Sequence, residues 1–178
     1  MSGRLRQALD SRRVAHLRIN EIADLWARPL AYSEFIIDLE NTVLSYGATA
    51  AFDRSVVALR DLHLELLPGR VVLVTNSRDG GLGLLARQAT GFDVVERAHK
   101  PFTSRAVLAR YVGRDPIVVG DQPLTDGLLA WRLRCPFVEL RLHDQVEPLW
   151  PRLLRLGGAV VGRLIFTDDS QTVPKWGT

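Results

Sequence analysis

Carboxylates, a hydroxyl, an amide and an ammonium recur in this 178-residue chain close to the ends of apolar segments. The residues concerned are Asp38, Glu40, Thr75, Asn76, Lys100, Asp121 and Asp126. If the apolar segments are strands of one parallel sheet, these groups meet at its carboxyl edge, where open α/β sheets bind their ligands. A set with this chemistry suits the transfer of a phosphoryl group assisted by Mg²⁺.

The residues after the first two apolar runs could form and handle a phosphorylated intermediate. Asp38 can attack phosphorus to give an aspartyl-phosphate. Glu40 points to the same side as Asp38 in an extended chain, so its carboxyl can face the leaving oxygen. The hydroxyl of Thr75 can hold a phosphoryl oxygen, and the side chain of Asn76 can add an amide donor.

Three further residues would help to neutralise a phosphate, one by its own positive charge and two by binding a metal cation. Lys100 can neutralise it and orient Asp38, and apart from Lys175 in the C-terminal tail it is the only lysine among 23 basic residues. An ammonium is a compact point charge that fits where the planar fork of arginine does not. Asp121 and Asp126 offer oxygen ligands of the kind that Mg²⁺ prefers. The sequence therefore predicts Mg²⁺ as the cofactor.

Each of these short motifs also has an ordinary structural explanation. An aspartate after an apolar run is often a cap or turn residue, and Thr75-Asn76-Ser77 is a common turn composition. The most specific single piece is the Gly-Asp-x4-Asp pattern that starts at Gly120. The functional hypothesis depends on the order in which all the pieces occur.

Hydrophobic patterning predicts strands that alternate with helices. We expect strands at 33–38, 71–74, 94–95, 117–119 and 137–140. We expect helices at 3–13, 21–26, 54–66, 82–89, 104–112 and 124–133, with Asn20 and Thr103 as caps and Gly91 closing the fourth. This order predicts an α/β fold, in which a mostly parallel sheet lies between two layers of helices as in Rossmann-like domains.

Composition places the chain among folded proteins, with 47% apolar and 24% charged residues. The single cysteine, Cys135, excludes an internal disulfide and indicates a buried structural thiol. No apolar run is long enough to cross a bilayer and no secretion signal is recognisable, so we expect a cytoplasmic location. Peripheral attachment to a membrane surface stays open.

The chain divides into four predicted parts. Residues 1–18 form a basic helical arm with five arginines and one acid, and residues 19–148 form the catalytic domain. Residues 149–166 are apolar with arginine interruptions, and residues 167–178 form a polar tail.

The sequence does not decide what the two flanking parts, residues 1–18 and 149–166, bind. The basic arm suits anionic lipid, nucleic acid or an acidic protein, or is simply a solvated helix face. Residues 149–166 suit a lipid surface, or pack on the domain or on another subunit. Nothing in the chain resembles a specific nucleic-acid-binding module.

The motifs together resemble those of the haloacid dehalogenase superfamily of phosphatases. Asp38-Leu39-Glu40-Asn41-Thr42-Val43 resembles its first motif, and Thr75 and Lys100 resemble the second and third. The run from Gly120 to Asp126 resembles the fourth. The residue patterns of the motifs are most similar to those of subfamily IIIA, the YqeG-like branch that includes phosphatidylglycerophosphate phosphatases.

The resemblance covers about residues 19–156 and implies a Rossmann-like domain, Mg²⁺ dependence and the roles given above. It also implies that Asp38 and Asp121 bind the metal, with the backbone carbonyl of Glu40 as a further ligand.

Glu40 departs from the family pattern, which has aspartate as the general acid and base. The extra methylene moves the carboxyl by about 1 Å, and a misplacement of that size costs about 10²-fold in rate. Three outcomes are open: a working phosphatase, slow turnover with a longer-lived aspartyl-phosphate, or a catalytically impaired binding subunit. In the last case the basic arm and residues 149–166 would be the working surfaces.

The spacing of the motifs leaves no room for a large cap domain. The intervals 38–75 and 75–100 each hold little more than one helix. An open site favours a bulky substrate, such as a lipid phosphate or a phosphorylated macromolecule, or closure by a partner subunit.

Overall fold

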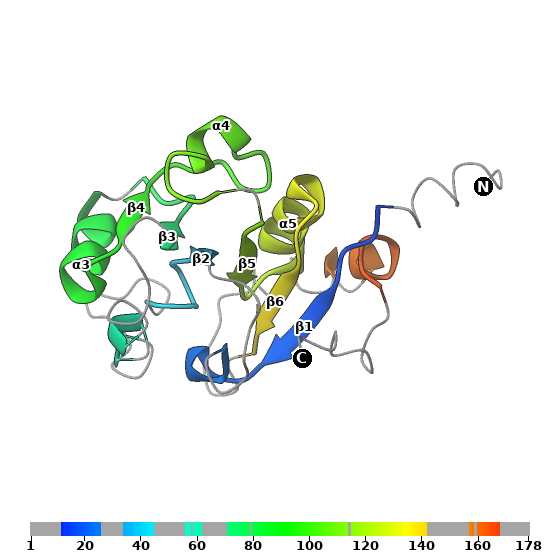
Figure 1. Ribbon diagram of the computed structural model, residues 1–178, viewed down its shortest axis with the longest axis horizontal. Coiled ribbons are helices and arrows are strands. Elements are labelled where there is room, and N and C mark those ends of the chain that lie inside the picture. The colour runs from blue at the N-terminus through cyan, green and yellow to red at the C-terminus, as the bar shows by residue number, and fades with distance from the viewer. Residues whose placement is uncertain are drawn as a thin grey trace, which may run out of the picture.

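The computed structural model describes residues 12–25, 34–44, 56–57, 59–61, 71–78, 80–113, 115–141, 157–158 and 160–167. Its centre is a six-stranded sheet in which every neighbouring pair is parallel (Figure 1). The strands are β1 (His16–Ile19), β2 (Phe35–Asp38), β3 (Val71–Val74), β4 (Asp93–Val95), β5 (Ile117–Gly120) and β6 (Phe137–Leu140).

The strand order is β1-β6-β5-β2-β3-β4. From β2 the chain moves outward through β3 to β4, then returns to β5 on the other side of β2 and continues to β6. The order therefore reverses between β2 and β5, which is where doubly wound sheets open a ligand crevice at their carboxyl edge. The predicted α/β fold with a parallel sheet is confirmed.

Helices cover both faces of the sheet. The helices are η1 (Ile22–Leu25, 3₁₀), α3 (Gly80–Thr90), α4 (Arg105–Leu108), η2 (Pro123–Gly127, a π-helical turn) and α5 (Leu128–Leu133), and residues 160–165 are also helical. Side chains of η1, α3 and the helical residue Leu59 pack with Ile37 and Leu73 on one face. Side chains of α4, α5 and the C-terminal turn pack with Ile36 and Val72 on the other.

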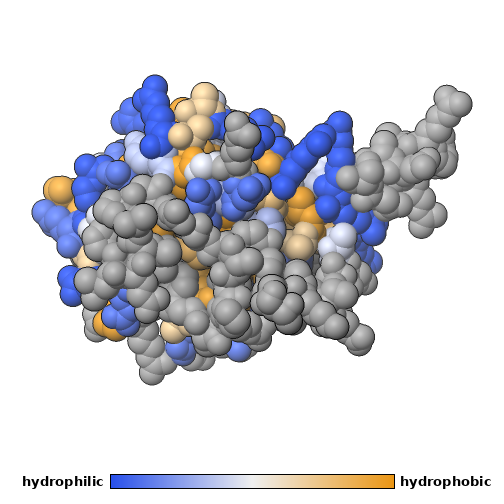
Figure 2. Space-filling model, in the orientation of Figure 1, coloured by the Kyte–Doolittle hydropathy of each residue, from blue (hydrophilic) through white to orange (hydrophobic). Residues whose placement is uncertain are grey.

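This two-sided packing explains why the central strands were predictable. All four residues of β2, β3 and β5 are buried, because alternate side chains enter the two cores. The predicted bounds of β3 and β6 are correct, and those of β2, β4 and β5 are correct to within two residues. Hydrophilic residues dominate the described surface in Figure 2, with hydrophobic side chains visible between them.

The strand β1 was not predicted, since residues 1–18 were expected to form a helical arm outside the domain; at residues 16–18 that prediction is wrong. β1 is an edge strand, and of its four residues only Ile19 is buried. His16 and Arg18 occupy the alternate positions, so the segment carries no apolar run. It forms a strand because it pairs with β6, a partner more than a hundred residues later in the chain.

Two predicted caps are wrong. The backbone N–H groups of Asn20 and Glu21 donate to the Asp24 carboxylate, so Asp24 rather than Asn20 satisfies the start of η1. Ser104 occupies the N-cap position of α4, and Thr103 is buried one residue earlier. The cap at Gly91 is confirmed, with a positive φ of 80° and a hydrogen bond to Arg87 O.

Two predicted helices, and the interval 38–75 in which no separate cap was expected, fall partly outside the described residues. Of the helix at 3–13 only residues 12 and 13 are described, and they are not helical; within 54–66, residues 56–57 and 59–61 are helical. Between Thr75 and Lys100 the described chain forms only α3 and β4, so it holds no separate cap domain there.

The described end of the C-terminal segment packs on the domain. Val14 and Phe166 form a parallel bridge, and Ile165 and Phe166 are buried. The helical turn at 160–165 lies beside β1, at the end of the sheet away from α3 (Figure 1). No helix in the described part of the chain is long and apolar enough to cross a membrane.

Candidate active site

Three carboxylates meet at the carboxyl edge of the sheet, beside the point where the strand order reverses. Asp38 ends β2 and Asp121 follows β5, and these two strands are neighbours. Asp126 comes from the turn η2. One carboxylate oxygen of each residue lies within 4.8 Å of the others, and all three residues are buried.

Lys100 lies inside this cluster. Its ammonium donates to Asp38 Oδ1 and, over 2.7 Å, to Asp126 Oδ1. The lysine side chain is only 4% exposed. The scarcity of lysine led us to expect an ammonium between a phosphate and a carboxylate, and here the ammonium lies between two carboxylates.

Asn76 fixes the backbone of Lys100. Its Oδ1 accepts the Lys100 N–H over 2.6 Å, and its Nδ2 donates to Lys100 O over 2.9 Å. These bonds engage both ends of the amide. Asn76 was predicted to donate to a phosphate, whereas in this arrangement it positions the lysine.

Thr75 and Glu40 form a second polar pair next to the carboxylates. Thr75 Oγ1 donates to Glu40 Oε2 over 3.0 Å and accepts the backbone N–H of Ser77 over 2.9 Å. The Glu40 side chain is not one of the three carboxylates in the cluster. Binding of a metal by the Glu40 backbone carbonyl stays a prediction.

Asn41 is a site residue whose role was not predicted. It has a positive φ of 59°, which asparagine tolerates better than most residues, and its Nδ2 lies 3.5 Å from Asp121 Oδ2. An asparagine three residues after the aspartate that ends a strand is the signal that could have indicated such a bend.

Gly120 makes room for Asp126. A Cβ atom at Gly120 would lie 2.3 Å from Asp126 Oδ2 and 2.4 Å from its Cγ, so any side chain there would displace this carboxylate. The backbone N–H of Gln122 donates to the same Oδ2 over 3.2 Å. The glycine of the Gly-Asp-x4-Asp pattern is therefore required for close approach of its second aspartate.

Burial and crowding perturb the protonation of the cluster. Burial raises the pKa of the Asp38 carboxyl well above its ordinary value, and the charge on Asp126 raises it further against the opposing effect of Lys100. Burial alone would lower the pKa of Lys100, but the carboxylates of Asp126 and Asp38 outweigh it and raise that pKa.

The donor set fits a hard divalent cation. Three carboxyl groups face one ammonium in a buried space, so ionisation of all three would leave two negative charges in excess. Buried charge is costly unless it is paired. All three candidate ligand atoms are carboxylate oxygens, which hard divalent cations prefer. Asp38, Asp121 and Asp126 are the side chains that could hold Mg²⁺.

Of the seven residues predicted to form the site, the structure brings Asp38, Lys100, Asp121 and Asp126 into direct contact or close approach, with Thr75, Glu40 and Asn76 around them. Comparisons of the chain with protein-family models, with curated proteins and with solved structures found no match.

Proposed function

We propose that this protein is a Mg²⁺-dependent hydrolase of phosphate monoesters that works through an aspartyl-phosphate at Asp38, as its resemblance to the haloacid dehalogenase phosphatases implies. One observation carries the proposal. A strand-end aspartate contacts the only lysine in the body of the chain, inside a buried cluster of two more aspartates. An aspartate that served only as a turn former would not need a buried counter-ion.

The surroundings of Asp38 favour one of its oxygens as the nucleophile. In the described part of the chain, the hydrogen bonds to this carboxylate come from Lys100 Nζ and the Leu39 N–H, and both end on Oδ1. Oδ2 is therefore the oxygen that would attack phosphorus. Bound Mg²⁺ would neutralise the phosphate and the excess charge of the carboxylates.

Glu40 would move the proton. In the first step the bond from Asp38 Oδ2 to phosphorus forms, the bond from phosphorus to the leaving oxygen breaks, and Glu40 gives its proton to that oxygen. In the second step Glu40 takes a proton from water as the water oxygen attacks phosphorus and Asp38 is released. The hydrogen bond from Thr75 holds the Glu40 carboxyl near the nucleophile.

The same hydrogen bond favours a second candidate function. Thr75 is also the residue predicted to hold a phosphoryl oxygen, and its hydroxyl proton already goes to Glu40. A longer acid tied to that hydroxyl would slow turnover, and the chain would then act as a binding subunit that retains the fold. Substrates with bulky groups suit either case, because the described chain between Thr75 and Lys100 contains no lid.

Hydrolysis of p-nitrophenyl phosphate with Mg²⁺ tests the proposal. We expect activity in the native chain and its loss in Asp38→Asn. We expect no change in Asp93→Asn, because this exposed acid begins β4 and so lies at the amino edge of the sheet, away from the carboxylate cluster. Activity that appears only in Glu40→Asp would favour the binding subunit. Activity that survives Asp38→Asn in full would refute the aspartyl-phosphate.

A further inference from the structure

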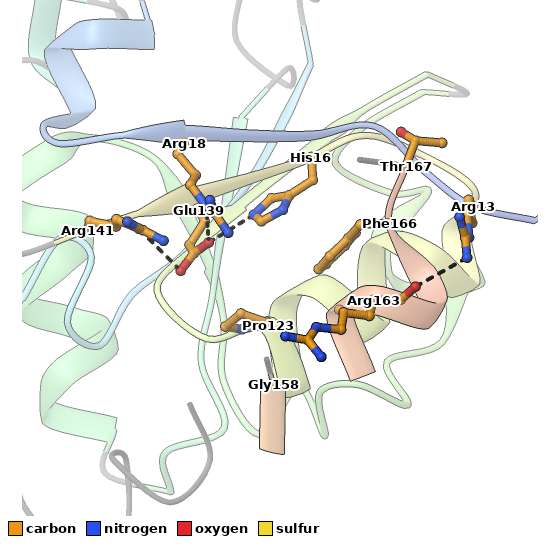
Figure 3. A pocket seen from close by; sticks show the side chains of 11 residues that line it. Arg13, His16, Arg18, Pro123, Glu139, Arg141, Gly158, Arg163, Phe166 and Thr167 are labelled. Carbon is orange, nitrogen blue, oxygen red and sulfur yellow. Dashed lines mark hydrogen bonds and ion pairs between the residues drawn. The ribbon is translucent and has the colours of Figure 1, made fainter. Parts of the chain in front are cut away.

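A polar cavity lies on the sheet face that α5 covers, outside the carboxylate cluster but close to it. Its volume is about 660 Å³, within the range of about 300–1,000 Å³ typical of small-molecule sites. Side chains from β1, β6 and the C-terminal helical turn surround it (Figure 3). The charged and polar ones are Arg13, His16, Arg18, Glu139, Arg141, Arg163 and Thr167.

The lining is strongly cationic. Its described residues include four arginines and one carboxylate, that of Glu139. Glu139 Oε2 lies 2.9 Å from His16 Nε2 and 3.2 Å from Arg18 Nε, and Oε1 lies 3.7 Å from Arg141 Nε. One carboxylate thus gathers three donors, and among the described lining residues the arginines outnumber the carboxylates.

The other side of the cavity is held in place by ring stacking. Phe166 stacks on His16 with ring centroids 4.3 Å apart, and on Phe137 at 5.4 Å. Arg13 Nη2 donates to Arg163 O over 3.2 Å, which ties the chain before β1 to the C-terminal turn. In Figure 3 the Arg163 side chain extends from that turn toward Pro123.

The cavity is a near neighbour of the carboxylate cluster. Strand pairing sets Glu139 opposite Gly120, one strand spacing of about 4.8 Å away. Gly120 immediately precedes Asp121 and contacts Asp126. Pro123, the first residue of the turn that carries Asp126, lines the cavity.

We propose that this cavity binds a phosphate or similar multivalent oxyanion, and that it receives a second anionic group carried by the leaving group of the substrate. Guanidinium forks match the oxygens of a phosphate, and several arginines around one cavity are a common means of binding one. The first part stands on the cavity alone. The second part rests on the proposed function, because it needs a phosphoryl group at Asp38.

Titration calorimetry with inorganic phosphate, without divalent cations, tests the first part. We expect the native chain to bind phosphate, and the double variant Arg141→Ala/Arg163→Ala to bind it at least tenfold more weakly. Arg141 and Arg163 are exposed, so circular dichroism should show that this variant keeps its fold. Arg87→Ala is the matched control, since this arginine lies on α3 against the other face of the sheet.

Asp38→Asn separates the cavity from the carboxylate cluster in the same titration. We expect it to bind phosphate like the native chain. Absence of binding to the native chain, equal binding to the double variant, or loss of binding in Asp38→Asn would each overturn the anion site.

Phosphate release from propane-1,3-diol bisphosphate and from propyl phosphate tests the second part. We expect a KM at least tenfold lower for the bisphosphate in the native chain, and loss of that preference in the double variant. Equal KM values would overturn the role in substrate recognition. No hydrolysis of either compound, together with phosphate binding as above, would refute the phosphatase and leave the anion site standing.

Discussion

Asn76 holds both backbone polar groups of Lys100, so the ammonium that contacts Asp38 is positioned from the end of the neighbouring strand β3. Lys100 lies in the loop between β4 and α4, and this amide ties it to the sheet. The relationship makes Asn76 a positioning residue for the ammonium that contacts Asp38.

Asn76→Ala should therefore impair both stability and turnover. It removes two hydrogen bonds, each worth about 0.5–1.5 kcal/mol, and we expect the free energy of unfolding to fall by about 1–3 kcal/mol. A shift of Lys100 approaching 1 Å would lower kcat about 10²-fold. Urea titration and steady-state kinetics measure the two effects. Gln88→Ala, an exposed amide on α3, is the control, and an unchanged kcat in Asn76→Ala would contradict the positioning role.

Mg²⁺ should stabilise the folded chain in the absence of any substrate. A ligand that binds only the native state at 100 times its Kd adds about 2.7 kcal/mol, and this appears as a higher Tm. We expect the Mg²⁺-dependent rise in Tm to disappear in Asp121→Asn and to persist in Asp115→Asn, an exposed acid outside the cluster. The same rise in both variants would show that Mg²⁺ binds elsewhere.

Cys135 should be inert in the native protein. Burial raises the pKa of its thiol to about 12, and the side chain packs in the core beside α5. At pH 8 only about one thiol in 10⁴ is then ionised, and the thiolate is the reactive form. Alkylation by iodoacetamide, followed by mass spectrometry, should be slow in buffer and fast in guanidinium chloride. Rapid labelling of the folded chain would contradict a buried thiol.

The contacts of Glu139 with His16, Arg18 and Arg141 should make the stability of the protein depend on pH. Burial opposes ionisation of Glu139, but the hydrogen bond from His16 and the charges around it lower its pKa below the ordinary 4.5. A carboxyl with a lowered pKa in the folded state stabilises it above the unfolded pKa, and this contribution is lost as pH falls through the folded pKa.

Native chain and Glu139→Gln should therefore differ in the slope of stability against pH below about 4.5. We expect the native chain to lose stability more steeply than Glu139→Gln as pH falls through this range, as measured by urea titration at each pH. Parallel curves for the two proteins would show that Glu139 has the same pKa folded and unfolded.

Apolar runs with polar residues at their ends were enough to predict the central sheet and the meeting of Asp38 and Asp121. Lys100 and Asp126 do not end strands, and they were assigned to the site by their chemistry and by the family resemblance. Strands buried on both faces must be apolar throughout, and parallel strands bring their carboxyl ends to one edge. Local sequence therefore carries this information, and the pattern at Asp38 and Asp121 could be read without knowing the strand order.

Contacts between distant residues could not be read in the same way. His16 and Glu139 are separated by 123 positions, and neither lies in a recognisable motif. The pairing of Thr75 with Glu40, the clamp of Asn76 on Lys100 and the arginine-lined cavity all depend on which strands become neighbours. Strand order is a property of the whole chain, because it is chosen by the combined packing of both cores and by pairing across long loops. Sequence was sufficient to place reactive groups at the strand ends, and folding of the complete domain chose the groups that surround them.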